Sequence, residues 1–393
     1  MGATTTNTEM LIGRAREIAT TVRERADAAE AARKVPAESI DELKKAGLFR
    51  LMQPARVGGF ELAYETYVPA VTEIAKACGS TGWVYSVLTM HCWQLALFPL
   101  AAQKDVWDDN PDALISSSYA PTGKAARVKG GFKLDGRWSF VSGCDHTDYT
   151  IIGGVAPLEE GGAPEFNFFL IPRKDYRIED DWHVIGLAAT GSKTIVLEDC
   201  FVPEHRVFTG AAARTCSPPG AEANKAAIYR VPFFTGTGHC TSVPAVGIAV
   251  GAYEDYVEEV SGRATRGGLA GGPKRIREFP TIQMRVAEAG ALIDAAQRLM
   301  AADSADLLSH AATGDVPVDL RERSRRDFSM GSRLATWAVD ALFEAEGGAG
   351  LYRRNRMQRA WRDIHAAGMH IGQNWDRTAT QFGRYALGLP PAP

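Results

Sequence analysis

The sequence lacks the marks of several common classes of protein. No apolar run in its 393 residues is long enough to span a bilayer, and the opening stretch MGATTTNTEM has no apolar core of a secretion signal. The formal net charge is only −3, which favours neither nucleic acid nor an anionic membrane as a partner. Six scattered cysteines without a CxxC pair argue against zinc and against a disulfide framework. We therefore expect a cytoplasmic protein with free thiols.

Several catalytic motifs are missing as well. The chain has no GxxxxGK[ST] phosphate loop, no HExxH and no GxSxG. Its glycine clusters, GTG at 236–238 and GGAG at 347–350, do not lie between a predicted strand and a predicted helix. If the protein is a redox enzyme, we expect that it does not take hydride from a nicotinamide by itself.

The pattern of apolar residues changes twice along the chain. Residues 1–112 carry apolar side chains at helical spacing, as in EMLIGRAREIATTVRERADAAEAARK. Residues 113–212 contain short β-rich runs such as FNFFLIPR and KTIVLEDCFVP, which suggest a small barrel or sandwich. Residues 213–393 contain four long amphipathic segments that fit an antiparallel bundle. The predicted fold is thus α+β and mainly α, with its three domains in the order helical, β, helical.

The stretch WSFVSGCDHTDY, residues 138–149, poses a question of its own. It begins as a strand, in which Trp138, Phe140 and Ser142 would share one face, and it turns at Gly143. A serine hydroxyl on the same face as two large aromatic side chains can be interpreted in two ways. It belongs either to a half-buried edge strand or to the wall of a site for a flat, polar cofactor.

Motifs in all three domains resemble those of one superfamily. The segment GLAATGSKTIVLEDCFVPEHRV (186–207) and the late GGAG look like the acyl-CoA dehydrogenase superfamily. Within it, GRWSFVSGCDHTDY, HCWQLALFPLAAQKDVW and RAWRDIHAAGMH are similar to the flavin-dependent monooxygenase branch. That branch includes the oxygenase components of 4-hydroxyphenylacetate 3-hydroxylase and of the secosteroid A-ring hydroxylase. The resemblance runs over nearly the whole chain.

This resemblance implies a fold, a cofactor and partners. The fold is an N-terminal helical domain, a central β-barrel and a C-terminal four-helix bundle, usually in a homotetramer, with the flavin between barrel and bundle. The implied reaction hydroxylates a small phenolic or polycyclic aromatic substrate through a flavin C4a-hydroperoxide made from O₂. The cofactor is reduced FMN or FAD, which diffuses from a separate NAD(P)H-flavin reductase.

The resemblance also assigns residues around the flavin. Val141, Ser142 and Gly143 would line the isoalloxazine, with the Ser142 hydroxyl bonded to the flavin N5. The other implied flavin neighbours are Trp83, Ser118 and Trp138 in the pocket wall, Arg263 (or Arg266) at the flavin phosphate, and Gln283 at a neighbouring subunit's cofactor. Without the resemblance, Ser142 reads as a serine that caps its own turn, and the arginines read as members of surface salt bridges.

Two histidines are expected near the substrate. His91 would lie by the substrate hydroxyl, where an imidazole that titrates near neutral pH takes a phenol's proton. His370 matches the end of the family motif better than His365, and it would share a helix face with Asp363, seven positions earlier. Taken alone, His91 reads as a core residue and His370 as a surface residue of the bundle.

Three functions stay open at this point. The first is aromatic hydroxylation, and the second is the same flavin chemistry directed at nitrogen or sulfur. The third is an acyl-CoA dehydrogenase, or a relative that only binds. A dehydrogenase needs a Glu base, and residues 364–381 contain no Glu, although some relatives hold that base on another helix.

Overall fold

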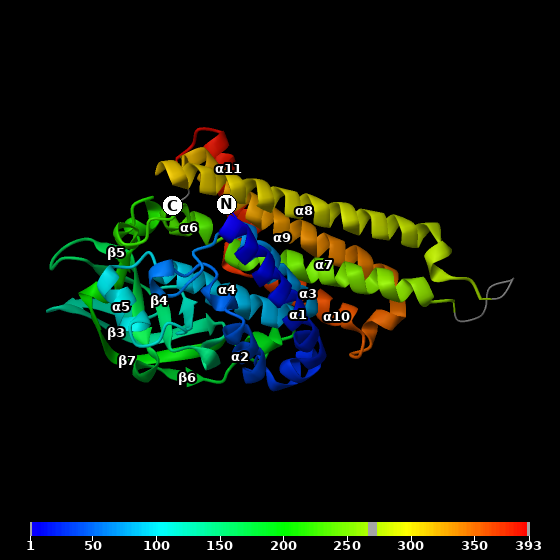
Figure 1. The fold of residues 1–393 in the computed structure, drawn as a ribbon, viewed down its shortest axis with the longest axis horizontal. Coiled ribbons are helices and arrows are strands. Elements are labelled where there is room, and N and C mark those ends of the chain that lie inside the picture. Colours follow the sequence, from blue (N-terminus) through cyan, green and yellow to red (C-terminus); the bar gives the residue numbers. More distant parts are fainter. Residues whose placement is uncertain (1, 266–272, 391–393) are drawn as a thin grey trace.

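The fold places long helices on one side of the molecule and the strands at the opposite end. The computed structural model describes residues 2–265 and 273–390. In Figure 1 the long helices of the second half of the chain run side by side, and the helix of residues 79–95 lies between them and the strands. The predicted mainly helical class, with the strands between two sets of helices along the chain, is confirmed. The domain boundaries at 112 and 212 stay a prediction.

One N-terminal helix is buried along its whole length. The helices are α1 (Gly2–Ala32), α2 (Ala37–Lys45), α3 (Tyr64–Ala77), α4 (Gly79–Leu95) and α5 (Leu100–Trp107). Helix α4 contains no Asp, Glu, Lys or Arg, and all of its residues are buried. It packs against the first strand on one side and against helices of the bundle on another. Its side chains are therefore available to a site between the strands and the bundle.

The strands form two four-stranded sheets that share one core. They are β1 (Ile115–Ser118), β2 (Lys124–Val128), β3 (Gly131–Val141), β4 (Tyr149–Pro157), β5 (Pro164–Pro172), β6 (Arg177–Glu179), β7 (Lys193–Pro203) and β8 (Val207–Thr209). Their order is β1-β4-β5-β8 in one sheet and β2-β3-β7-β6 in the other. Only the β1–β4 pair is parallel among the described strands. The expected barrel is therefore not closed in the described part of the chain, where β1 and β2 are edge strands.

An irregularity near the end of β3 changes which side chains face the core. Trp138 pairs with Ile195 and Val141 pairs with Lys193. Between these two pairs β3 advances by three residues while β7 advances by two. The extra residue is a bulge, and Phe140 has a φ of 64°. Trp138 and Val141 are both fully buried, whereas Phe140 is 71% exposed. The expectation that Trp138 and Phe140 share one face is wrong, because a bulge breaks the alternation of the strand.

Among the described residues the bundle contains five long helices where four were expected, because its last predicted helix is broken. They are α7 (His239–Gly262), α8 (Pro280–Thr313), α9 (Val318–Glu346), α10 (Arg356–Gly368) and α11 (Trp375–Ala386), and the four-residue α6 (Phe233–Gly236) precedes them. After Gly368 the His370 side chain accepts from the Gly372 N–H, and the Asn374 side chain accepts from the Arg377 N–H. These caps begin new helical turns. His370 thus lies in a turn, and it does not share a helix face with Asp363.

The described helices include none with both the length and the apolar character needed to cross a membrane.

Candidate functional site

Side chains from three distant segments meet at the end of β3. The indole Nε1 of Trp83, on α4, donates to the Ser142 Oγ at 3.2 Å. The ring of His370 lies 5.6 Å from the Trp83 ring, in an edge-on arrangement. The two sequence motifs that carry Ser142 and His370 therefore converge in space, on helix α4. Trp83, Ser142 and His370 are the predicted site residues that the structure brings together.

A chain of hydroxyl groups leads away from Ser142. Ser142 Oγ lies 2.7 Å from Ser192 Oγ, and Ser192 Oγ lies 2.7 Å from Thr190 Oγ1. Thr190 Oγ1 donates to the Leu187 carbonyl at 2.8 Å. Each hydroxyl has a single proton, so Thr190 must accept from Ser192, and Ser192 must accept from Ser142. One lone pair of Ser142 takes the Trp83 N–H, which leaves one lone pair to accept from a further donor.

Gly143 allows the turn to lie directly on α4. Its φ of 70° is in the left-handed region, and an added Cβ would lie 3.0 Å from the Val84 Cγ1. Its N–H donates to the Thr190 carbonyl at 2.9 Å. The turn after β3 is therefore held both by α4 and by the loop that supplies Thr190.

His91 is buried and has partners at both ring nitrogens. Its Nδ1 lies 2.7 Å from the Ile115 carbonyl, which can only accept, so Nδ1 carries the proton. Its Nε2 then accepts from the Ser117 hydroxyl at 2.8 Å. Burial lowers the pKa of His91 to about 4. The expectation that this imidazole titrates near neutral pH is therefore wrong.

Ser117 is the partner of His91 that sequence reasoning missed. Alternation along β1 turns Ser117 toward α4 and turns Ser118 the other way, where its hydroxyl donates to the Ser139 carbonyl at 2.8 Å. The run ISSS signals a polar strand, but three consecutive serines do not reveal which of them faces the helix.

The two histidines of the late motif point in different directions. His365 Nε2 lies 2.9 Å from Asp340 Oδ1 on α9, away from Trp83. His370 belongs to the exposed residues, yet desolvation by the protein around its ring lowers its pKa to about 4. The ring therefore has protein packed around it, although the residue as a whole stays exposed to solvent. Its Nδ1 accepts from the Gly372 N–H, so the neutral ring carries its proton on Nε2.

Three other residues expected to line the flavin have side chains that pack or hydrogen-bond within the two sheets. Trp138 is in the core between the sheets and donates to the Gly153 carbonyl at 2.9 Å. Val141 is in the same core, and the Ser118 hydroxyl is bonded within the strands as described above. The expectation that Trp138 lines the pocket is wrong, since its ring is fully buried. Only the backbone of Val141 reaches the turn.

The residues expected at the flavin phosphate or at a neighbouring subunit's cofactor lie far from this cluster within one chain. Arg263 pairs with the buried Glu346 carboxylate at 2.7 Å, and Gln283 is exposed and donates to the Arg277 carbonyl. In Figure 1 the end of α7 and the start of α8 are at the far end of the molecule from the strands. Arg266 lies outside the described residues. A role for Arg263 or Gln283 therefore requires another subunit.

Sequence reasoning also missed an aromatic pair beside Ser142, in which Phe140 is exposed and Trp182 is half-buried. Phe140 and Trp182 lie edge to face, with their ring centres 5.9 Å apart. Large apolar side chains near the other site segments are also exposed: Ile185 by 77%, Met369 by 83% and Ile371 by 67%. Exposed apolar surface next to a few directed hydrogen-bonding groups suits a flat heteroaromatic ligand. The motif around Ser142 pointed to Phe140 as an aromatic, but its outward direction depends on the bulge.

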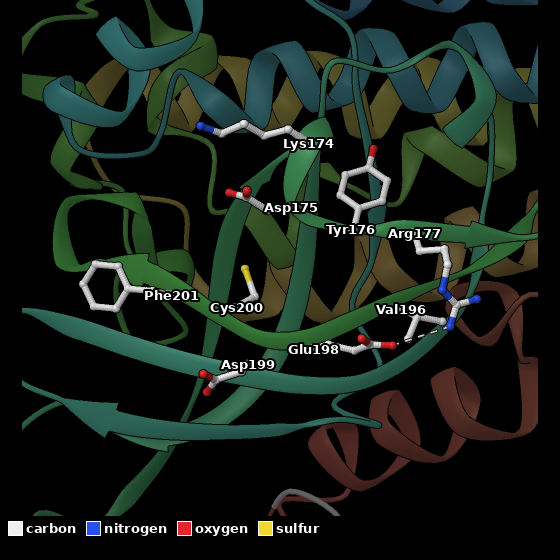
Figure 2. Close-up of a pocket in the computed structure, with 9 residues that line it drawn as sticks. All are labelled: Lys174, Asp175, Tyr176, Arg177, Val196, Glu198, Asp199, Cys200 and Phe201. Carbon is white, nitrogen blue, oxygen red and sulfur yellow. Dashed lines mark ion pairs between the residues drawn. The ribbon is translucent and has the colours of Figure 1, made fainter.

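A separate hollow of about 560 Å³ lies on the outer face of β6 and β7 (Figure 2). It is lined by Lys174, Asp175, Tyr176, Arg177, Val196, Glu198, Asp199, Cys200 and Phe201. Arg177 and Glu198 form an exposed ion pair across it at 3.7 Å. None of the predicted site residues is among its lining residues. Because the directed hydrogen bonds converge at Ser142, we place the candidate site there.

Helices before and after the two sheets, with a polar turn between sheets and bundle, define the fold class of acyl-CoA dehydrogenases. The family descriptions "Acyl-CoA dehydrogenase, N-terminal domain" and "Acyl-CoA dehydrogenase, C-terminal domain" match residues 5–108 and 239–375.

Relatives define the branch more closely. The chain is 44% identical to the oxygenase component of an FADH2-dependent resorcinol hydroxylase from Rhizobium sp., over 97% of this chain and 95% of the relative. It is 42% identical to the oxygenase subunit HsaA of a flavin-dependent monooxygenase from Rhodococcus jostii, over 94% and 96% of the two chains. The crystal structure of 3-HSA hydroxylase from Rhodococcus sp. RHA1 superposes with a TM-score of 0.91 at 40% identity, covering 98% of both chains. The chain therefore belongs to the flavin-dependent monooxygenase branch of the acyl-CoA dehydrogenase superfamily, as its motifs predicted.

Proposed function

We propose that this chain is the oxygenase component of a two-component flavin-dependent monooxygenase that hydroxylates an aromatic substrate. The relatives support the class of enzyme. The observation that carries the proposal is the uncharged cluster of Trp83, Ser142 and Ser192, which lies beside the exposed Phe140 and the half-buried Trp182. Such a cluster offers directed hydrogen bonds and flat apolar surface in one place.

The residues present fit a reduced flavin. Ser142 Oγ has one lone pair left, and it accepts the N5–H of a reduced isoalloxazine without disturbing the Trp83 or Ser192 bonds. Phe140 and Trp182 offer apolar faces for the rings. When bound, reduced flavin supplies the two electrons that activate O₂. Ser142 holds the proton at N5 as an acceptor, and Trp83 keeps the Ser142 hydroxyl oriented.

His91 and Ser117 suit a phenolic hydroxyl. Ser117 donates to His91, so its oxygen is free to accept a substrate O–H. With a pKa of about 4, His91 does not deprotonate a resting phenol. It accepts the phenolic proton only after oxygen has been added to the ring, because the O–H of the oxygenated ring is then strongly acidic. His91 thus orients the substrate through Ser117 first and acts as the base afterwards.

His370 is the proposed third group of the site. It lies beside Trp83 and carries an Nε2–H, which suits a hydrogen bond to a substrate or to oxygen. Its lowered pKa keeps this group an uncharged donor at pH 7.

The dehydrogenase alternative fits this site poorly. Removing a proton next to a thioester needs a carboxylate base at the flavin. Among the described residues, no carboxylate is hydrogen-bonded to Trp83, Ser142 or His370. Oxygenation of nitrogen or sulfur uses the same flavin groups and stays the second candidate. The uncharged environment of His91 and Ser117 favours a phenol over an amine cation.

We further propose a cytoplasmic homotetramer that receives reduced FMN or FAD from a separate NAD(P)H-flavin reductase. Met284 on α8 and Trp337 on α9 are 69% and 43% exposed, which supports contacts with a second copy along the bundle. In such an assembly Arg263 and Gln283 would reach the flavin of a neighbouring subunit.

The test supplies electrons in two ways. With NADH or NADPH and oxidised flavin, the pure protein should give no product. With chemically reduced FMN or FAD and O₂, it should hydroxylate a phenol, and ¹⁸O₂ should place one labelled atom in the product. A panel of phenols, indoles, amines and thiophenes separates carbon from nitrogen and sulfur oxygenation.

Two results would refute the proposal. One is NADH oxidation by the pure protein in the presence of a phenol, and the other is anaerobic dye reduction with an acyl-CoA thioester.

A further inference from the structure

A buried carboxylate on α10 holds the loop that supplies Thr190 and Ser192. Asp363 is only 3% exposed, and its Oδ1 accepts from the Leu187 N–H at 2.6 Å. Leu187 begins the 187–192 loop ahead of β7, so this bond joins the bundle to the sheets. A buried charge is costly unless it is paired and hydrogen-bonded.

Leu187 is held at both ends of its backbone. Its φ of 51° is uncommon for a leucine and needs support from its surroundings. Asp363 binds its N–H, while its carbonyl accepts from Thr190 Oγ1 at 2.8 Å and from Trp182 Nε1 at 3.2 Å. The loop also lies directly on α10, since a Cβ on Gly186 would be 2.1 Å from the Arg362 carbonyl. The position of the Leu187 carbonyl, where the hydroxyl chain ends, therefore depends on Asp363.

The second oxygen of Asp363 faces the start of α4. A Cβ added to Gly79, the first residue of that helix, would lie 2.9 Å from Asp363 Oδ2. The N-terminus of a helix attracts a carboxylate. Helix α4 carries Trp83 and His91, and the 187–192 loop carries Thr190 and Ser192. The Asp363 side chain therefore lies between the two elements that supply the site.

We infer that Asp363 is a positioning residue, which fixes Leu187 and thereby the direction of the Thr190–Ser192–Ser142 hydroxyl chain. This inference rests on the proposed function, because the chain matters only if Ser142 must keep a lone pair for the flavin. Burial raises the pKa of Asp363 to about 6, against the Leu187 N–H and the charges of Arg359 and Arg362, which lower it. The Leu187 N–H and the two arginines therefore offset part of the cost of burying this carboxylate.

Three variants separate the hydrogen bond from general packing. Asp363→Leu has a similar size but no acceptor, whereas Asp363→Asn keeps one carbonyl oxygen for the Leu187 N–H. Ile364→Ala weakens the same buried helix without touching that bond. Hydrogen–deuterium exchange of the 186–193 peptide, measured without flavin, reports on the loop. Anaerobic titration with reduced flavin and the ratio of peroxide to product report on Ser142.

We expect Asp363→Leu to speed exchange in the 186–193 peptide about tenfold or more, since a hydrogen bond to a charged group is lost. Reduced flavin should bind more weakly, and more peroxide should be released per product. Asp363→Asn should restore most of each property, and Ile364→Ala should change none of them beyond its loss of stability. If Asp363→Leu does not fold, Thr190→Val breaks the next link and should give the same excess of peroxide.

Wild-type exchange rates in Asp363→Leu would overturn the inference. So would faster exchange with the flavin affinity and peroxide ratio of Ile364→Ala, or normal coupling in Thr190→Val. Failure of the proposed function is seen separately, in the wild type. There, reduced flavin would fail to bind or to protect residues 140–143 from exchange.

Discussion

Replacing Ser142 by alanine should affect folding and coupling by different amounts. In the variant the buried Trp83 Nε1 loses its acceptor, and an unpaired buried donor costs about 1–3 kcal/mol of stability. Ser192 keeps its bond to Thr190, so the rest of the hydroxyl chain survives. A bound flavin loses one neutral hydrogen bond at N5, worth roughly 0.5–1.5 kcal/mol, or a factor of a few to about ten. Peroxide release should rise by that factor relative to product.

The assay measures peroxide and hydroxylated product in the same reaction, with reduced flavin supplied and O₂ added. Thermal unfolding measures the stability loss in parallel. Ser139→Ala is the matched control, because Ser139 lies on β3 three residues before Ser142 and its hydroxyl is bonded to Thr194 Oγ1 at 2.8 Å. If Ser142→Ala couples as well as the wild type and Ser139→Ala, then Ser142 does not hold the flavin N5 proton.

Three further predictions concern charge, proton transfer and assembly. His91→Asn should slow hydroxylation by about 10²-fold or more while reduced flavin still binds. The wild-type rate should show no titration of His91 between pH 6 and 9, because the pKa of this residue is about 4. An unchanged rate in the variant would mean that His91 only packs in the core. The pKa of Asp363 is about 6 in the folded protein and near 3.8 in the unfolded chain. The folded state therefore binds this proton more tightly, and the free energy of unfolding should be highest below about pH 4. It should fall as the pH rises through 6, by up to about 3 kcal/mol. Unfolding of Asp363→Asn across pH 4–8 should lack that decline, and identical pH dependence in both proteins would contradict it. Light scattering at micromolar concentration should give the mass of a tetramer, and the mass of a monomer would exclude it.

The order of the domains was predictable because it depends on local periodicity. Helical and strand spacings are visible in short windows, and the motif around Ser142 directed attention to the turn where Trp83, Ser142 and His370 meet. The direction of Phe140 was not predictable, because the bulge in β3 exists only in the pairing with β7. The break after Gly368 depends on caps by His370 and Asn374, and histidine is not among the usual capping residues.

The chemistry of the histidines was harder to predict than their location. A sequence gives an ordinary pKa, whereas burial of His91 lowers it to about 4. The same holds for the choice between Ser117 and Ser118, since only the packing of β1 on α4 decides which hydroxyl meets His91. Asp363 stood out in the sequence only as a neighbour of His370 in helical spacing, and its bond to Leu187 bridges 176 positions of the chain.

The hydroxyl chain explains how a site can hold a proton without removing it. Ser142 can accept the N5–H of a reduced flavin, but its own proton is committed to Ser192, and the chain ends at the Leu187 carbonyl. A peptide carbonyl is not a base, so the proton has no route away from the flavin along this chain. Asp363 could act as a base, yet it contacts the N–H side of Leu187 and is separated from the chain by the backbone. Loss of peroxide requires the N5 proton to leave, whereas oxygen transfer to an aromatic ring does not. An aligned chain with no base at its end therefore favours transfer, and a carboxylate that reached Ser142 directly would favour loss.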